Sequence, residues 1–383
     1  MTGRPLVRLA HTAVRRARGV GADRSPSFCE NVRAWAADVL DTDSTTVLPP
    51  RRVKRNLPHT IEPEIDSAYV TCQDVSQREK YVVPIAGARI VGGIGLIVLP
   101  DGSYSSESVY ARRVLEEDSD YRSRKQRPTI SKPGTYFSLV DVWTVRSGGI
   151  YYHWLHDTLE RLVGVLDLLP QGTKFIVPDD LKPFQLETLR LVGIEEELLV
   201  RYSGNEVWEL ERLYFSPPTS NSGSHRRDAD LWLRDRLMEA LKVPRAGRAP
   251  ARRRLFVSRR NMKGRRITNE EEVEAILRDR GFETLMPETL SLRRQVELFA
   301  EASVIVSTHG SAFTNILFSP PGLVVLDMVP PSMLHTAYVF WSMSEELDHQ
   351  YWYLAAADSG TGSVPDTYVP CEKLAATLER MSL

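Results

Sequence analysis

Residues 303–329, SVIVSTHGSAFTNILFSPPGLVVLDMV, contain two strand-like apolar runs separated by a polar turn and a short third segment. VIVS and LVVLDMV have the length and branched composition of buried strands, whereas SAFTNILF suits a short helix. A strand, a helix and a strand in this order predict two parallel strands of one sheet. The polar residues between them would then lie at the carboxyl edge of the sheet, where folds of this kind hold their ligands.

The chain before this stretch alternates in the same way from about residue 240. RRLFVSR and ETLMP are expected strands, and TNEEEVEAILRDRGF and SLRRQVELFAEA are expected helices. Thr268 or Asn269 would cap the first helix and Ser291 the second, because short polar side chains accept hydrogen bonds from the free amides at a helix start. The pattern predicts a doubly wound, Rossmann-like α/β domain.

The first half of the chain has strand-like runs as well, among them KYVVPIAGARIVG, TYFSLVDVWTV, KFIVPDD and LERLYFSPP. GGIYYHWLHDTLERLVGVLDLLP and KPFQLETLRLVGI are expected helices, so this half is a second α/β unit. The expected division is a basic, Pro-rich extension at 1–60, an α/β domain at 61–240, a Rossmann-like domain at 241–360, and a C-terminal helix at 361–383 that packs back across the domains.

The composition argues against several classes of protein. The 49 basic and 50 acidic residues give a net charge of −1, so no overall field favours nucleic acid. Three cysteines without CxxC spacing indicate a reducing compartment rather than a disulfide scaffold. No run approaches the length of a membrane span, which argues against a membrane-spanning helix. The expected location is cytoplasmic. GxxxxGK[ST] and a complete GxGxxG are missing, which argues against a P-loop enzyme and against NAD.

The N-terminal stretch MTGRPLVRLAHTAVRRARGVGADR is rich in arginine and has no acidic residue before Asp23. Three interpretations stay open: a transit peptide, a basic amphipathic segment that contacts an anionic membrane surface, and a basic extension of a cytoplasmic protein. The second interpretation predicts a peripheral membrane contact.

A basic loop, SRRNMKGRRITNE (258–270), follows the first strand of the C-terminal half. Guanidinium groups match the oxygen geometry of phosphates, and the helix N-terminus behind the loop adds backbone donors, so the loop suits a diphosphate. The alternatives are a solvated basic surface loop and a patch that binds RNA. The candidate ligand-binding residues of this loop are Ser258, Arg259, Arg265, Arg266, Asn269 and Glu270.

The polar turn HGSAFTN supplies a second group of candidates. His309 can donate to a phosphate or a sugar, Gly310 permits close approach of the backbone, and Ser311 can cap the next helix. Thr314 and Asn315 follow one turn later. The alternative is a histidine that caps a helix among ordinary turn residues. Gly-x-Ser-x-Gly is missing around Ser311, so the turn is not a nucleophile elbow.

The helix expected in YYHWLHDTLERL (151–162) places His153, His156, Asp157 and Glu160 near one another. A histidine with a carboxylate four residues further on is typical of a general base whose tautomer is set by its partner. A metal site is a competing interpretation, but HEXXH is absent and no third ligand has diagnostic spacing. Exposed polar residues on an amphipathic helix are the remaining alternative.

Taken in order, the three motifs resemble glycosyltransferase family 61. The family pattern combines YYHWL-x-D-x-L-x-R, SR followed by R-R-x-x-N-E, and HG-x-x-x-TN-x-x-F-x-P-P-G. In this chain they read YYHWLHDTLERL, SRRNMKGRRITNE and HGSAFTNILFSPPG, and the resemblance covers roughly residues 85–345. Ala312 stands where the family often has a second glycine.

The resemblance implies a GT-B architecture, two Rossmann-like domains facing a cleft, and an inverting transferase that uses a nucleotide sugar without a bound metal or other cofactor. The C-terminal domain would hold the donor through Arg259, Arg265, Arg266 and the HGSAFTN turn. His153 or Asp157 would act as the base on the acceptor side.

The implied acceptor is a glycan or a lipid-linked molecule, in the synthesis of a surface or capsular polysaccharide of the bacterial type. A non-catalytic module that binds nucleotides or glycans on the same fold is the alternative function. A basic RNA-binding protein ranks third, because the net charge is balanced. The sugar, the nucleotide and the oligomeric state stay open.

Overall fold

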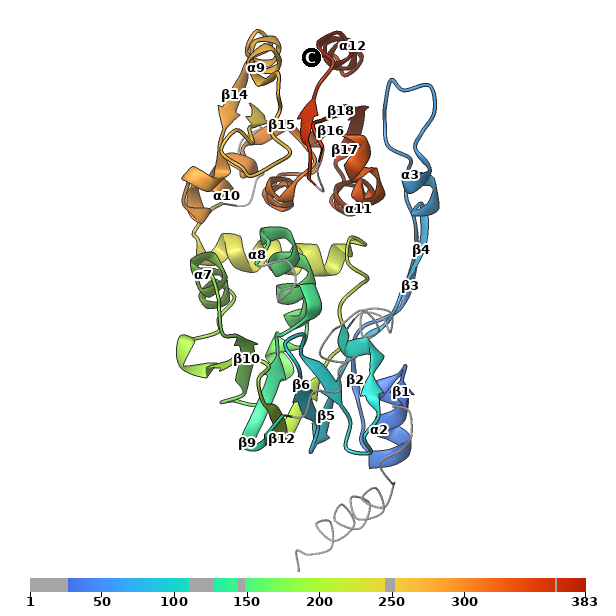
Figure 1. Cartoon of the computed structure of the whole chain (residues 1–383), viewed down its shortest axis with the longest axis vertical. Coiled ribbons are helices and arrows are strands. Elements are labelled where there is room, and N and C mark those ends of the chain that lie inside the picture. Colours follow the sequence, from blue (N-terminus) through green and yellow to red (C-terminus); the bar gives the residue numbers. More distant parts are fainter. Residues whose placement is uncertain (1–26, 110–126, 144–148, 245–251, 362–363) are drawn as a thin grey trace, which may run out of the picture. The chain divides into compact units, whose positions relative to one another are not determined.

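The chain folds into two units, each with a large sheet of its own (Figure 1). The computed structural model describes residues 27–109, 127–143, 149–244, 252–361 and 364–383. The described residues of 1–50 and 78–221 form the first unit, and those of 51–77 and 222–383 form the second. The segment 51–77, which the expected division places before or at the start of the first domain, thus groups with the second unit.

A parallel sheet of five strands lies at the centre of the second unit. Its strands are β13 (Arg253–Val257), β14 (Phe282–Leu285), β15 (Ala302–Thr308), β16 (Val324–Val329) and β17 (Gln350–Ala355). Their order across the sheet is β14-β13-β15-β16-β17, so the chain turns to one side after β13 and to the other from β15 onward. The doubly wound α/β order that the alternation predicts is therefore present in this half.

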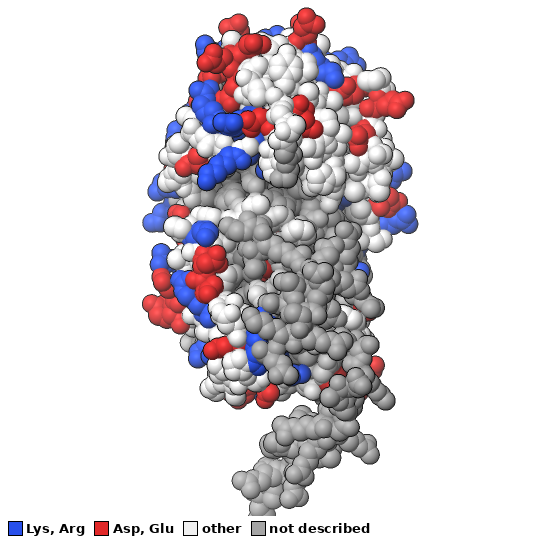
Figure 2. Space-filling view, in the orientation of Figure 1, with Lys and Arg blue, Asp and Glu red and all other residues white. Residues whose placement is uncertain are grey.

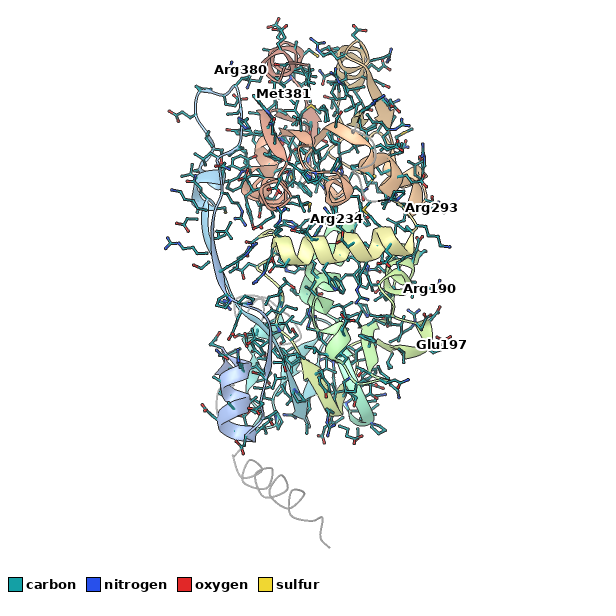
Figure 3. The ribbon with its side chains drawn as sticks, turned by 180° about the vertical axis from the view of Figure 1, so that it is seen from behind. Arg190, Glu197, Arg234, Arg293, Arg380 and Met381 are labelled. Carbon is teal, nitrogen blue, oxygen red and sulfur yellow. The ribbon has the colours of Figure 1, made fainter. Side chains whose placement is uncertain are left out.

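Helices cover both faces of this sheet. The described helices of 222–383 are α8 (Arg227–Ala240), α9 (Glu270–Arg278), η6 (Pro287–Thr289), α10 (Leu292–Ala300), η7 (Ser311–Phe318), η8 (Pro331–Thr336), α11 (Tyr338–Glu346) and α12 (Cys371–Arg380), of which α8 packs on η7 and α11. α9 and α12 lie side by side on one face (Figure 1), where Val273 and Leu374 join strand residues such as Phe256 in one buried cluster. Met381, labelled in Figure 3 just after α12, packs against the same cluster.

The two predicted helix starts are capped in different ways. Ser291 accepts a hydrogen bond at 3.3 Å from the Arg294 amide and caps α10, as expected. Asn269 precedes α9, but its side chain bonds the backbone of Val369, donating to the carbonyl at 2.8 Å and accepting from the amide at 3.1 Å. Asn269 therefore ties α9 to the segment that leads into α12.

The first unit contains a ten-stranded mixed sheet. Parallel strands β9 to β11 form one side, and β12 is parallel to β9 but antiparallel to β5 and β6. The strands are β1 (Phe28–Cys29), β2 (Thr45–Leu48), β5 (Lys80–Ala86), β6 (Arg89–Val91), β7 (Leu96–Val98), β8 (Tyr104–Ser105), β9 (Thr129–Ser138), β10 (Lys174–Pro178), β11 (Leu199–Tyr202) and β12 (Val207–Phe215).

The helices that the structure describes in the first unit are short. They are α2 (Val32–Leu40), η1 (Ser106–Val109), the π-helix η2 (His153–Thr158), η3 (Leu159–Leu162), η4 (Leu166–Leu168), α7 (Pro183–Leu191) and η5 (Glu196–Leu198). Val83, Ile176 and Leu213 of the sheet and Ala36 of α2 lie in one buried cluster, so α2 covers part of the sheet.

The segment 51–77 packs on the β17 edge of the second unit's sheet. It contains the antiparallel pair β3 (Arg51–Lys54) and β4 (Asp74–Gln77) and the short helix α3 (Ser67–Thr71). The His59 amide donates to the Tyr351 carbonyl at 2.9 Å, and the His59 carbonyl accepts from the Tyr353 amide at 3.0 Å. Tyr69 of α3 is fully buried, with its ring centroid 4.8 Å from that of Tyr353. The segment thus extends the sheet and covers its aromatic edge.

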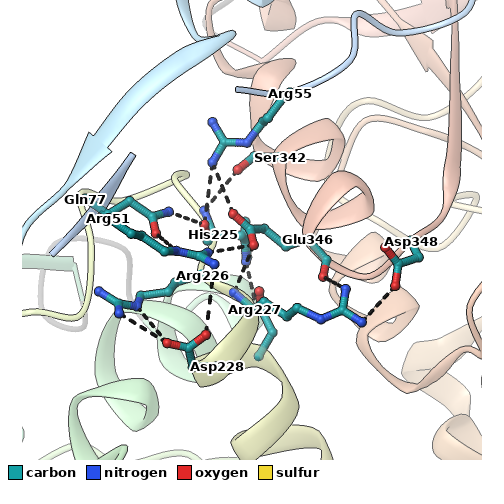
Figure 4. A network of polar contacts seen from close by, with 11 residues as sticks. Arg51, Arg55, Gln77, His225, Arg226, Arg227, Asp228, Ser342, Glu346 and Asp348 are labelled. Carbon is teal, nitrogen blue, oxygen red and sulfur yellow. Dashed lines mark hydrogen bonds and ion pairs between the residues drawn. The ribbon is translucent and has the colours of Figure 1, made fainter. Parts of the chain in front are cut away.

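A polar network fixes the start of this segment (Figure 4). Glu346, at the end of α11, accepts from Arg51 at 2.6 Å and from the Arg227 amide at 3.1 Å, and it lies 3.8 Å from the guanidinium of the buried Arg55. Burial raises the pKa of Glu346, and Arg51 opposes that rise. Glu346 is therefore the carboxylate that compensates a cation inside the unit.

Surface charge in the described part of the molecule is mixed. Figure 2 shows Lys and Arg side chains intermixed with Asp and Glu over the described residues of the visible face. Among the described helices, none combines the length and the apolar character that a membrane crossing requires.

Replacement of Glu346 tests the network. We expect Glu346→Gln to lower the free energy of unfolding by about 3 kcal/mol, because the buried Arg55 cation loses its carboxylate. Urea unfolding of the full chain measures this loss. Glu301→Gln is the matched control, since the exposed Glu301–Arg253 pair contributes less than about 1 kcal/mol. An equal loss in the two variants would contradict the role of Glu346.

Candidate active site

Two loops of the second unit meet where the strand order reverses. Ser258 and Arg259 follow β13, and His309 and Gly310 follow β15, the strand directly beside it. One connection leaves this point toward β14 and the other toward β16. A doubly wound sheet opens a crevice at such a point, because the two loops diverge to opposite sides. The structure therefore brings two predicted motifs together at the position typical of a ligand site.

Arg259 lies buried at this point, with 6% of its surface exposed. Its guanidinium donates to the Gly264 carbonyl at 3.4 Å, and its Nε is buried without a hydrogen-bond partner in the described part of the chain. A β-carbon at Gly310 would overlap the guanidinium. Gly310 has extended backbone at φ 175°, so the requirement for glycine here is one of space and not of conformation.

Arg265 adds a second cation. Its Nη1 donates to the His309 carbonyl at 2.9 Å, and its Nε is also buried without a partner among the described residues. Burial and the neighbouring Arg265 lower the pKa of Arg259 to about 10, and burial lowers that of Arg265. Over the described residues, neither guanidinium forms an ion pair with a carboxylate. The site therefore carries positive charge that an anionic ligand would neutralise.

His309 is held in a buried chain of polar side chains. Its Nδ1 lies 2.8 Å from an oxygen of Asp327 on β16, and the same oxygen accepts from the Tyr351 hydroxyl on β17 at 2.8 Å. Asp327 has no exposed surface, and the pKa of Tyr351 is raised by burial and by Asp327. With Asp327 at Nδ1, the imidazole keeps Nε2 toward Thr336 at 3.4 Å.

Sequence reasoning assigned no role to Asp327 or Tyr351. The signal for Asp327 was available, because it is the one acidic residue in the apolar run LVVLDMV. Tyr351 had no comparable signal, because its strand was not predicted. It lies two residues before Tyr353, the residue opposite Asp327, and its hydroxyl reaches Asp327 diagonally across the two strands.

Ser258, Glu270 and Asn315 support the site from within. The Ser258 hydroxyl donates to Glu270 at 2.6 Å, and Glu270 also accepts from Arg260 at 2.9 Å. The Asn315 amide donates to Gln295 of α10 at 2.9 Å. With Asn269, which bonds Val369, these three predicted residues join neighbouring elements through their polar atoms.

The remaining predicted residues of this unit differ in exposure. Thr314 is fully buried, and its hydroxyl has no hydrogen-bond partner within the described residues. Ser311 and Ala312 are half-buried at the start of η7. Arg266 is 53% exposed at its side chain and forms an ion pair at 2.6 Å with Asp366, a residue that the sequence analysis did not single out.

A pocket of about 570 Å³ lies beside the Arg loop, at the start of α9. A volume of this size is in the range of small-molecule sites. Its carboxylates can accept hydrogen bonds from hydroxyl groups. The lining residues are Arg260, Arg266, Ile267, Thr268, Asn269, Glu270, Glu271, Glu272 and Asp366.

The third motif, in the first unit, winds as a π-helix over His153–Thr158 and then as a 3₁₀ helix over Leu159–Leu162, not as the regular helix expected. His156, Asp157 and Glu160 are buried together with the leucines, so the alternative of an exposed polar face is wrong. These polar side chains are accommodated by pairing, as in the contact of 2.6 Å between His156 Nδ1 and Glu160. π-Helical turns are frequent at functional sites.

His153 and Asp157 form the second such pair. His153 Nδ1 lies 2.6 Å from an Asp157 oxygen, and the side chains are 21% and 5% exposed, respectively. The indole of Trp143 stacks on the imidazole, with ring centroids 4.9 Å apart and planes 5° from parallel. The carboxylate and the indole fix the imidazole orientation, and Nε2 has no hydrogen bond to any of the described residues, which suits proton transfer. Trp143 was missed by sequence reasoning, because it lies outside the motif, ten residues before His153.

Comparison with known proteins finds one family model that includes sequence motifs from both units. A family model described as Glycosyltransferase 61 matches residues 151–326, from the residues just before the π-helix to the middle of β16. The match includes His153, Arg259 and His309. No curated protein matches the chain.

Substitution of Gly310 tests the geometry around Arg259. We expect Gly310→Ala to weaken binding of inorganic pyrophosphate about tenfold, because the new methyl group displaces the guanidinium. Titration calorimetry measures the affinity. Gly93→Ala is the control, since a β-carbon there meets open space and the backbone is not left-handed. Unchanged pyrophosphate affinity in Gly310→Ala would refute the proposed role of the close contact.

Proposed function

The chain belongs to glycosyltransferase family 61, and we propose that it transfers a sugar from a nucleotide-sugar donor to a hydroxyl group of a glycan or lipid-linked acceptor. We further propose that transfer inverts the anomeric centre and proceeds without a bound metal or other cofactor.

One observation carries the proposal: two buried guanidiniums that form no ion pair with a carboxylate of the described residues lie at the switch point of a doubly wound sheet. A nucleotide sugar brings a diphosphate, whose charge would compensate Arg259 and Arg265. His309, oriented by Asp327 at Nδ1, adds a polar ring at the same edge, where Nε2 can accept a hydrogen bond from a sugar hydroxyl. Gly310 and Ser311 supply backbone and hydroxyl groups at the start of η7, so this region is the proposed donor site.

The chemistry follows from the charges that develop. The acceptor oxygen forms a bond to the anomeric carbon from the face opposite the diphosphate, while the bond from that carbon to the diphosphate oxygen breaks. The electron pair of the broken bond stays on the diphosphate, where Arg259 and Arg265 stabilise the added charge. The hydroxyl proton passes to a base of the enzyme. Such cations supply the electrostatic part of what a metal ion does in other transferases.

His153 and Asp157 are the proposed base. Asp157 is the more buried member and lies against Nδ1, so it orients the imidazole, while the partly exposed His153 can reach a hydroxyl group. The observed pair therefore favours His153 as the group that takes the proton and Asp157 as its partner.

The larger setting of the reaction stays a proposal. A GT-B architecture is supported by the doubly wound sheet of the second unit, in which the donor would bind. Synthesis of surface or capsular polysaccharide, a cytoplasmic location and a peripheral membrane contact are predictions that rest on the resemblance and on the basic residues 1–26, which lie outside the described part of the chain.

Release of nucleoside diphosphate from a panel of UDP-, GDP- and dTDP-sugars tests the function. We expect one donor class to be consumed in the presence of acceptor, at the same rate in EDTA and in Mg²⁺ or Mn²⁺. An absolute requirement for a metal ion would overturn the metal-free mechanism. Binding of a donor without turnover against a broad acceptor panel would favour the non-catalytic alternative.

Variants of the proposed base separate chemistry from binding. We expect His153→Ala and Asp157→Ala to lower kcat by about 100-fold or more, because no group then takes the hydroxyl proton. Donor affinity, measured by calorimetry, should stay within about twofold of the parent. Asp180→Ala is the control, since this carboxylate is 70% exposed at the surface of the same unit. Loss of donor binding in the His153 or Asp157 variants would refute their assignment.

A further inference from the structure

The short hairpin of β18 (Ala357–Ser359) and β19 (Asp366–Tyr368) contacts the loop that carries Arg265. Asp366 accepts from the Arg266 amide at 3.0 Å and from two nitrogens of its guanidinium, at 3.2 and 2.6 Å. The hydrogen bond from Arg266 lowers the pKa of Asp366. Unlike Arg259 and Arg265, Arg266 is thus already neutralised by a carboxylate.

Backbone hydrogen bonds join the same two segments on either side of this ion pair. The Arg265 amide donates to the Pro365 carbonyl at 3.2 Å, and the Thr367 amide donates to the Arg266 carbonyl at 2.8 Å. The Thr268 amide donates to the Thr367 carbonyl at 2.8 Å. Residues 265–268 are therefore held along β19 as a short ladder.

Arg265 needs such support, because its backbone is left-handed at φ 53°. A residue with a side chain seldom adopts this conformation unless its surroundings impose it. This backbone conformation directs the Arg265 side chain so that its Nη1 donates to the His309 carbonyl. If the ladder were released, the loop would relax toward ordinary backbone angles and the guanidinium would leave its place.

The other strand of the hairpin holds the opposite side of the site. Asp358 of β18 accepts from the Ser332 amide at 3.0 Å and from its hydroxyl at 2.6 Å. Ser332 belongs to η8, which also carries Thr336, whose hydroxyl lies 3.4 Å from His309 Nε2. One hairpin thus attaches to both loops that surround Arg265 and His309.

We propose that the β18–β19 hairpin is a clamp for the donor site, and that Arg266 and Asp366 are positioning residues that fix Arg265 instead of contacting the diphosphate themselves. Asp358 has the same role for η8. This inference rests on the proposed function for its ligand, but the clamp itself is defined by contacts within the second unit.

A double-mutant cycle distinguishes a positioning role from direct contact. We expect Arg266→Gln and Asp366→Asn each to weaken binding of the nucleoside diphosphate that the parent prefers by about fivefold, an effect at the upper end for an exposed ion pair. The double variant should bind no more weakly than either single variant, because both changes release the same ladder. If Arg266 contacts the phosphates directly, Asp366→Asn would instead free it and strengthen binding, which would overturn the proposal.

A second measurement needs no ligand. Hydrogen–deuterium exchange of the amides of Arg265, Thr367 and Thr268 should be faster in both single variants, and Asp358→Asn should accelerate exchange in η8. Arg293→Gln is the control, because its exposed ion pair with Glu297 on α10 lies outside the clamp (Figure 3). Unchanged exchange in the Arg266 and Asp366 variants would overturn the clamp. Faster exchange in the Arg266 and Asp366 variants, together with a parent chain that binds no nucleoside diphosphate, would leave the clamp standing and refute the proposed function.

Discussion

The burial of two neighbouring cations, neither of which forms an ion pair with a carboxylate in the described part of the chain, constrains the second unit more than any other interaction. Arg259 and Arg265 repel each other, and their burial removes part of their hydration shell. The fold compensates by directing the Gly264 and His309 carbonyls at the two guanidinium groups. Position 310 is a glycine in this arrangement, because a β-carbon there would overlap the Arg259 guanidinium. The cost of such burial must be met by the parallel sheet and its aromatic edge, which rank among the most deeply buried parts of the unit.

Much of the second unit could be predicted from sequence, because its signals are local. The apolar runs and helical periodicity from Arg253 to Val329 locate seven elements, and each signal lies within a short stretch of sequence. Parallel strands place their following loops at one edge, so Arg259, Arg265, His309 and Gly310 could be grouped before any coordinates. The cap at Ser291 followed from residue chemistry alone.

The rest could not be predicted, because it depends on which polar atoms meet across long separations. Asp327 meets His309 over 18 residues, and Asp366 meets Arg266 over 100. Periodicity shows which face of an element is buried but not which side chains bond there. The π-helix at His153 is a further case, since its leucines have ordinary helical spacing while its polar residues are buried in pairs. The mixed sheet of the first unit likewise depends on pairings between distant strands.

The place of segment 51–77 in the second unit limits which recombination events between related genes would preserve the fold. The second unit is assembled from two stretches of chain that the greater part of the first unit separates in sequence. A crossover that exchanged only the stretch from residue 222 onward would combine Tyr351 and Tyr353 of one parent with the covering α3 of another. In such a hybrid, Glu346 and its ion-pair partner Arg55 would also come from different parents. Relatives of this chain are thus expected to diversify by substitution within the unit, since recombination of contiguous halves breaks its core.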